Sequence, residues 1–391
     1  MKRTIGIIGL FLLVCACAVA DKTPVNDGLL VNDDEKALWQ QALEEQRILN
    51  DSALIHEDSQ LDEYLSSVVH RLQPHDLPDK LSFKIVVVQD PYFNAFAFPN
   101  GVIYVHTGML ARMDNEAQLA ALLAHEMSHS IHRHTLRAYR RIRENPGLMA
   151  SLQDTLARLA MVEELARYLG LTGSMAAVTG YARELELEAD VAGLDYLIAA
   201  GYDPYEALRL FEHLKKDIEG EQVKEPYFFG SHPQIQARID AVTHLLQTKY
   251  PHIHSGVRNT ELFSSKVSPV VLENARLELR SGRFAAARRS VQKYLRLHHS
   301  DARAHYLMGE IFRQRDAGQD ASRALTHYQK AITYDASYAE PHKAIGLIHY
   351  KKGQRKLARK YFESCLLLAP DTPDKDYIQG YIKQCVRDGG G

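Results

Sequence analysis

The stretch "LLAHEMSHSIHRH" (122–134) decides the fold expected for this chain. It places His125, Glu126 and His129 in a long, mostly apolar run. Residues four apart share one face of a helix, so the two imidazoles can bind one zinc ion. Glu126, beside the first of them, can act as general base and then as general acid in the hydrolysis of a peptide bond. The stretch therefore predicts a helix that carries a catalytic zinc site.

A second helix can complete this site. The chain contains 19 histidines, which makes an accidental His-Glu-x-x-His easier, so supporting residues matter. In "RELELEAD" (183–190), Glu186 and Asp190 lie four apart on one helix face. Glu186 is the candidate third ligand, and Asp190 can accept a hydrogen bond from the far nitrogen of a ligand imidazole. Glu184 and Glu188 lie off that face and are expected to be solvated.

A later loop adds a histidine and an arginine. In "SHPQIQARI" (231–239), His232 precedes Pro233, and Arg238 follows at the start of a helix. His232 could stabilise the oxyanion or bind the zinc as a fourth ligand, while Arg183 and Arg238 are expected to hold the local geometry. A zinc ion closed by four protein ligands is usually structural. A non-proteolytic scaffold or chaperone with a structural zinc site therefore stays open as the alternative.

A short sheet is predicted upstream of the metal helix. The segment "LSFKIVVVQD" (81–90) reads as a strand, and "NAFAFPNGVIYVHTGML" (94–110) as a hairpin around a Pro-Asn-Gly turn. If the first hairpin strand is exposed at the sheet edge, Asn94, Ala95 and Phe96 can bind an extended substrate by backbone pairing. An ordinary covered strand is the alternative.

Helical patterns fill most of the remaining chain. Asp114 is expected to cap the metal helix, which is predicted to continue to about Tyr139. His132 and His134, which follow the motif, are expected to support the ligands or to pack. The other predicted helical segments are 36–73, 148–169, 181–201, 203–220 and the residues after 231. The expected fold class is therefore mainly α with a small β-sheet.

A repeat begins near residue 268. Small residues recur as Ala275, Gly309 and Gly346, at intervals of 34 and 37 residues. A 34-residue period with small residues at helix contacts is typical of the tetratricopeptide repeat. Three repeats and a closing helix are predicted, at 268–301, 302–338, 339–372 and 373–387. Such an α-solenoid presents a concave surface that binds other proteins.

The N-terminus has the features of an export signal. Lys2 and Arg3 precede an apolar segment, and Ala18-Val19-Ala20 offers a cleavage site, so residues 1–20 are expected to be a signal peptide. A lipoprotein signal with Cys17 as the modified residue is the alternative. Both alternatives predict a bacterial periplasmic protein, either soluble or lipid-anchored. The net charge of −2 gives no indication of a nucleic-acid partner.

Together these motifs resemble the zinc metallopeptidase family of HtpX and the CAAX prenyl endopeptidases. The resemblance covers about residues 50–250 and rests on "HEMSH", "ELEAD", the "NAFAFPNG" hairpin and "SHP" with a later arginine. It implies a zincin-like metallopeptidase domain at 21–255 with one zinc ion per chain. One departure is "PNG" (99–101), where many relatives have two glycines; asparagine also tolerates left-handed conformations, so the turn is expected to persist.

The export signal, the lack of membrane-spanning segments and the repeat domain at 268–387 resemble the exported, repeat-bearing members of this family. The resemblance implies a chaperone-like protease that degrades or assists unfolded or stalled outer-membrane β-barrel proteins. It also implies that the repeats contact the outer-membrane assembly machinery and that His232 ligates zinc in a resting state. Cys365 and Cys385 could pair in an oxidising compartment or remain buried thiols.

Overall fold

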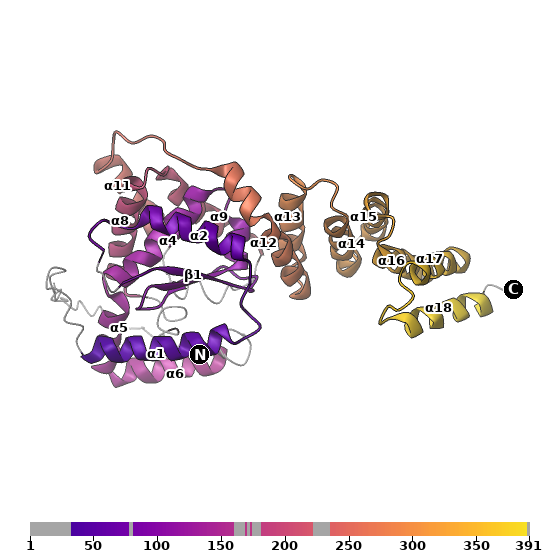
Figure 1. Cartoon of the computed structure of the whole chain (residues 1–391), viewed down its shortest axis with the longest axis horizontal. Coiled ribbons are helices and arrows are strands. Elements are labelled where there is room, and N and C mark those ends of the chain that lie inside the picture. Colours follow the sequence, from indigo (N-terminus) through magenta and orange to yellow (C-terminus); the bar gives the residue numbers. More distant parts are fainter. Residues whose placement is uncertain are drawn as a thin grey trace, which may run out of the picture.

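The computed structural model describes residues 33–77, 81–159, 169, 173, 181–221 and 235–388. The predicted signal peptide at 1–20, Cys17 and His232 lie outside these residues. Figure 1 shows a lobe built around a small sheet and, beyond it, an extended array of helices that leads to the C-terminus. The described chain is mostly helical with one small sheet, which confirms the predicted fold class.

Three strands form the sheet: β1 (Lys84–Val88), β2 (Ala95–Ala97) and β3 (Val102–His106). Their order is β1-β3-β2, with β1 parallel and β2 antiparallel to β3, so the predicted hairpin is confirmed. The hairpin turn requires a glycine, because Gly101 has φ +90° and a Cβ there would lie 2.4 Å from the Ser82 carbonyl oxygen.

The last strand is shorter than the sequence predicted. A strand was expected to continue to Leu110, whereas α3 already covers Thr107–Arg112. The Asp90 carbonyl oxygen accepts hydrogen bonds from the Gly108 amide and the Thr107 hydroxyl. These bonds take the place of further strand pairing and start the helix.

The sheet separates two apolar cores. Side chains on one face, among them Ala95, pack with α2 (Ser59–Leu72) and α4 (Glu116–Ile131). Side chains on the other face, among them Phe96, pack with α1 (Asp33–Asn50). In Figure 1 the sheet accordingly lies between α1 and the helices α2 and α4. The helix with the His-Glu-x-x-His motif, α4, therefore belongs to one face only.

Helix α4 begins at a different cap from the one expected. Asn115, not Asp114, is the N-cap, because the Asn115 side chain accepts a hydrogen bond from the Gln118 amide at 3.1 Å. The Gln118 side chain in turn accepts from the Asp114 amide at 2.8 Å. Two amides at the start of the helix are thus satisfied, in the manner of a capping box.

Helix α4 also ends earlier than predicted. It stops at Ile131 instead of continuing to about Tyr139, because Arg133 adopts a left-handed conformation with φ 54°. A second helix, α5 (His134–Arg143), starts directly afterwards. The break brings the first residue of α5 beside the last turn of α4.

The remaining described helices of this lobe are α6 (Pro146–Leu159), α8 (Arg183–Ala199), α9 (Tyr205–Glu221) and α11 (Ile235–Thr248). Helix α8 packs along α4, α9 packs on α4, and α11 packs on both α8 and α9. Gly201 follows α8 with φ +79°, the left-handed C-terminal position expected from the sequence. Within the described residues, no helix is long and apolar enough to cross a bilayer.

The array contains α12 (Thr260–Arg280), α13 (Phe284–Leu295), α14 (Ala302–Arg315), α15 (Asp320–Tyr334), α16 (Ala339–Lys351), α17 (Arg355–Leu368) and α18 (Lys375–Asp388). Each helix packs on the next one along the chain, as in a tetratricopeptide solenoid. Cys365 and Cys385 are both buried there.

The glycines of the repeat pattern lie at helix contacts, as predicted. A Cβ at Gly309 would come within 2.4 Å of the Tyr328 ring, and a Cβ at Gly346 within 2.7 Å of the Phe362 ring. Each glycine thus leaves room for an aromatic ring of the following helix.

The first helix of the array is also part of the lobe. Helix α12 begins at Thr260, and its early residues Phe263 and Val267 are buried in the core that contains α4. Arg112 of α3 donates to Glu278 of α12 at 2.6 Å, and both side chains are buried. The array is therefore attached through α12 by apolar and ionic contacts.

Candidate metal centre

Helices α4 and α8 bring three predicted ligands together. Nε2 of His125 lies 3.0 Å from Nε2 of His129. The two oxygens of Glu186 lie 3.5 Å from the first nitrogen and 3.6 Å from the second. All three residues are buried, and their ligand atoms lie within 4.8 Å of one another, which one metal ion can bridge. Two imidazole nitrogens and a carboxylate oxygen are ligands that zinc prefers, so these residues fit a zinc ion.

A glycine that the sequence analysis did not single out allows this approach. A Cβ at Gly193 of α8 would lie 3.0 Å from the backbone nitrogen of His125 and 3.2 Å from its Cα. A larger residue would therefore push α8 away from α4 at the first ligand. The signal in the sequence is a lone glycine inside a helical pattern, which usually has a packing or functional reason.

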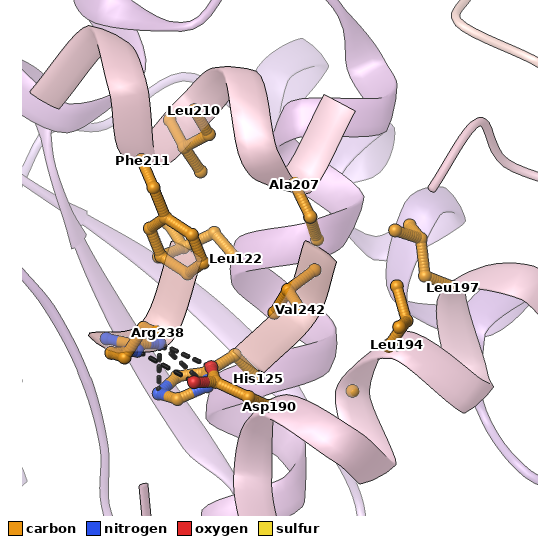
Figure 2. Close-up of a pocket in the computed structure, with 12 residues that line it drawn as sticks. Leu122, His125, Asp190, Leu194, Leu197, Ala207, Leu210, Phe211, Arg238 and Val242 are labelled. Atoms are coloured by element: carbon orange, nitrogen blue, oxygen red, sulfur yellow. Dashed lines mark hydrogen bonds and ion pairs between the residues drawn. The ribbon is translucent and has the colours of Figure 1, made fainter. Parts of the chain in front are cut away.

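Asp190 and Arg238 hold His125 on the side away from the other ligands. The Asp190 carboxylate lies 3.0 Å from Nδ1 of His125. Arg238 donates to both oxygens of that carboxylate, at 2.6 and 2.9 Å, and its guanidinium lies 4.6 Å from the centre of the Phe211 ring. Figure 2 shows the three polar side chains joined in one network. The structure thus brings both predicted supporting residues to the first ligand.

This network determines the charges around His125. Burial and the Arg238 charge oppose protonation of His125, but hydrogen bonds with Asp190 and Glu186 outweigh them and raise its pKa to about 9. Burial opposes ionisation of Asp190, yet the charge of Arg238 and the hydrogen bond with His125 lower the pKa of Asp190 below its usual value. Asp190 is therefore an anionic acceptor that orients the ligand imidazole.

His129 has a different environment. The Tyr181 ring stacks on it with 4.1 Å between centroids. Nδ1 of His129 lies 2.8 Å from Nδ1 of His134, and Nε2 of His134 lies 3.5 Å from Glu188. Burial lowers the pKa of His134 to about 3, so this imidazole is neutral at pH 7. Glu188 was expected to be solvated, but it is only partly exposed and accepts a hydrogen bond from Arg137 at 2.7 Å.

Glu126, which follows the first candidate ligand on α4, is also buried. Its side chain is 1% exposed. Its charge contributes to raising the pKa of Tyr181, which stacks on His129, and of Arg238, which holds Asp190. The Glu126 carboxylate thus interacts electrostatically with a neighbour of each ligand histidine.

The predicted substrate strand has buried side chains. Asn94, Ala95 and Phe96 are all fully buried. Phe96 stacks on Tyr104 at 5.4 Å, in the core on the sheet face away from α4. The whole residue is buried in each case, so the backbone of this strand is covered as well, as in the alternative of an ordinary covered strand.

The backbone of β2 has one side that faces away from β3. Asn94 and Phe98 hydrogen-bond with β3, so Ala95 and Ala97 direct their N–H and C=O groups to the opposite side. No described strand pairs with β2 on that side. The Ser130 hydroxyl in the last turn of α4 donates to the Phe98 carbonyl at 3.1 Å, which ties the end of β2 to the metal helix.

A small apolar cavity lies behind the first ligand. It has a volume of about 30 Å³ and is bounded by His125, Asp190, Arg238, Phe211 and other residues that Figure 2 labels. That volume holds about one water molecule. It is too small for a substrate side chain, so a substrate has to approach from another direction.

Comparison with known proteins identifies the lobe. Residues 56–246 match the model of peptidase family M48, and residues 317–353 match a model of the TPR repeat. The chain carries a peptidase domain of family M48. The M48 match includes all three candidate ligands, Glu126, Asp190 and Arg238, and it confirms the metallopeptidase type that the motifs predicted.

The M48 domain also has curated relatives. A β-barrel assembly-enhancing protease of Escherichia coli O157:H7 is 32% identical over 199 residues, which are 49% of this chain and 40% of that protein. A putative β-barrel assembly-enhancing protease of Vibrio cholerae is 28% identical over 236 residues, 58% of this chain and 48% of that protein. The mitochondrial metalloendopeptidase OMA1 of Arabidopsis thaliana is 32% identical over 161 residues, 40% of this chain and 30% of that protein. The chain spans less than half the length of each of these relatives, whose names support a metallopeptidase.

Two predicted site residues of the M48 domain are not brought to the ligands by the described structure. Arg183 is exposed in the first turn of α8. His232 lies in the segment 222–234, outside the described residues. The roles assigned to both from the sequence stay predictions.

Proposed function

We propose that the protein is a zinc-dependent endopeptidase in which His125, His129 and Glu186 bind one zinc ion per chain. The observation that carries this proposal is the buried convergence of their ligand atoms beside Glu126 within an M48 domain. A zinc ion held there would lower the pKa of a water molecule and polarise the carbonyl group of the peptide bond.

The chain's own residues carry the proton transfers. Glu126 takes the proton from the attacking water and then delivers a proton to the leaving amine. His232 stabilises the developing oxyanion, or occupies the fourth zinc position when no substrate is bound. Asp190 keeps His125 oriented, and Arg238 keeps Asp190 ionised and in place. Arg183 is a further candidate for holding this region in shape.

Substrate binding is proposed for the backbone edge of β2. Asn94, Ala95 and Phe96 belong to a strand whose outer N–H and C=O groups could pair with an extended peptide if the edge, which is buried in this structure, became accessible. Backbone pairing recognises extended conformation more than sequence. Such a site favours unfolded protein segments as substrates.

The names of the bacterial relatives suggest the biological setting. We assign residues 1–20 to a signal peptide, 21–255 to the protease domain and 268–387 to the repeat domain. The protein then works in the periplasm, soluble or anchored through Cys17. There it degrades or assists unfolded or stalled outer-membrane β-barrel proteins. The repeats contact the outer-membrane assembly machinery, in line with the relatives' name and the TPR match.

The test uses the purified mature chain, loaded with zinc and mixed with an unfolded β-barrel precursor. We expect the native chain to cleave the precursor and Glu126→Gln to bind zinc without cleaving. A gain of cleavage in His232→Ala would identify an inhibitory fourth ligand, and a loss would identify a catalytic role. If none of the three cleaves although zinc is bound at one per chain, a structural zinc site in a non-proteolytic scaffold replaces the proposal.

A further inference from the structure

The two ligand histidines differ in what their far nitrogens face. Nδ1 of His125 faces the Asp190 carboxylate at 3.0 Å. Nδ1 of His129 faces a second imidazole, with its Nδ1 2.8 Å from Nδ1 of His134. The partner of a ligand histidine fixes which ring nitrogen carries the proton, so this difference bears on the metal.

A single proton arrangement satisfies the contact on the His129 side. Two ring nitrogens at hydrogen-bond distance need one donor and one acceptor. If His129 binds the metal through Nε2, its proton is on Nδ1, and His134 must accept with its own Nδ1. The His134 proton is then on Nε2, which lies 3.5 Å from a Glu188 oxygen. Arg137 donates to that carboxylate at 2.7 Å and holds it in place.

The fold keeps both rings in this orientation. The left-handed residue Arg133 ends α4 so that His134 folds back onto the helix. His134 is fully buried. On its other side, His129 is covered by Tyr181, whose hydroxyl is fixed by the Thr135 hydroxyl at 2.8 Å. Neither imidazole ring can therefore rotate without displacing the residues packed against it.

We propose that His134 is a positioning residue for the metal centre: its Nδ1 accepts a hydrogen bond from the Nδ1–H group of His129 and so presents Nε2 of His129 to the zinc ion. A Glu188 oxygen, to which Arg137 donates a hydrogen bond, lies 3.5 Å from the other nitrogen of His134. The inference rests on the proposed zinc site and adds a residue outside the ligand set. One ligand histidine thus has a carboxylate as its partner and the other an imidazole.

The test measures zinc affinity of the full chain by competition with a chromophoric chelator, which does not depend on cleavage. His134→Leu removes the acceptor, and we expect zinc affinity to fall about 10- to 100-fold, as for other outer partners of metal ligands. His134→Asn places an amide oxygen near the position of Nδ1 and should recover most of the affinity. His132→Leu is the matched control, because His132 contacts Glu188 at 3.4 Å but no ligand, and its affinity should match the native value.

The outcomes separate the inference from the proposed function. A native chain that does not bind zinc overturns the metal site itself. A native chain that binds zinc while His134→Leu binds equally tightly overturns the role of His134. Equal losses in the leucine and asparagine variants would show a packing effect and would also overturn it.

A second measurement does not depend on the folding of any substitution at this buried position. In the zinc-loaded native chain, ¹⁵N spectra of the histidine side chains report which nitrogen of each ring carries the proton. We expect protons on Nδ1 of His129 and on Nε2 of His134, with a coupling across the bond between the two rings. A proton on Nδ1 of His134 would contradict the proposal.

Discussion

The M48 domain and the repeat array both have a glycine at a close helix–helix contact, but the two contacts have different consequences. In both, a glycine lets one helix approach its neighbour closely. Gly193 of α8 faces the backbone of His125, so the narrow gap brings ligand groups of two helices together. Gly309 of α14 faces the Tyr328 ring, so the gap is filled by an apolar ring. The same helix contact thus builds a reactive site in one region and a packed surface in the other.

The two regions also differ in how far apart along the chain the partners of their buried carboxylates lie. In the array, Glu310 accepts from Arg313 of its own helix and from Tyr328 of the next one. In the M48 domain, Asp190 is paired with Arg238, which follows it by 48 residues. Local pairs stabilise individual helices, whereas pairs between distant segments assemble a site whose parts depend on one another.

The largest expected effect concerns the contact between the regions. Glu278→Ala leaves the buried Arg112 guanidinium without its carboxylate, and breaking a buried ion pair costs about 3–5 kcal/mol. Because α12 belongs to both regions, we expect the whole calorimetric unfolding transition to move to lower temperature. An exposed pair, disrupted by Arg359→Ala, serves as the control and should move the transition little. Two separate transitions, with only the array affected, would show that the regions are independent.

Removal of zinc should affect the two regions unequally. A ligand at 1,000 times its dissociation constant stabilises the folded state by about 4 kcal/mol. After chelation we expect faster amide hydrogen exchange in α4 and α8, which carry the ligands, and little change in α14 to α17. Readdition of zinc is the control and should restore protection. Uniform acceleration along the chain would contradict a metal effect centred on the M48 domain.

Substitution of Gly193 and Gly309 tests the two close helix contacts. Gly193→Ala and Gly309→Ala each force a methyl group into a filled contact, which typically costs 1–3 kcal/mol. Only Gly193→Ala should also weaken zinc binding, because its methyl group meets the His125 backbone. Urea unfolding and zinc titration of both variants check this. Weakened zinc binding in Gly309→Ala would remove the distinction between the two contacts.

The smallest effect is a pH dependence at the same interface. Lys293 of α13 donates to the carbonyl oxygens of Ala111 and Met113, and burial lowers its pKa to about 8. Since the unfolded chain keeps the ordinary higher pKa, it binds more protons than the folded chain above pH 8. The free energy of unfolding should therefore rise with pH from 8 towards 10, on the order of 1 kcal/mol.

The control for this pH dependence is Lys293→Met. Its free energy of unfolding should lack the increase over the same pH range. An equal increase in both chains would assign the pH dependence to other groups.

Features set by short-range spacing could be predicted from the sequence. His125, Glu126 and His129 depend on one helix, and Glu186 with Asp190 on another, so their spacing already predicted one face each. The repeat period likewise predicted the glycines at helix contacts. Such patterns are local, and the structure retains them.

Features that depend on distant parts of the chain could not be predicted. The early end of α4 requires Arg133 in a left-handed conformation, which arginine rarely adopts and no local pattern indicates. The role of Gly193 depends on the helix that packs against it. Glu188 was expected to be solvated, because its partner Arg137 could not be foreseen. Arg137 lies on α5, which the sequence predicted as a continuation of α4.

The rate of hydrolysis of unfolded casein is the decisive measurement for a catalytic zinc site, since it does not depend on the choice of a β-barrel substrate. The measurement compares the zinc-loaded native chain with Glu126→Gln, with zinc content determined for both. We expect one zinc ion per chain in each and a rate at least about 100-fold lower in the variant. Equal rates in the two chains, or hydrolysis by a native chain that holds no zinc, would contradict it.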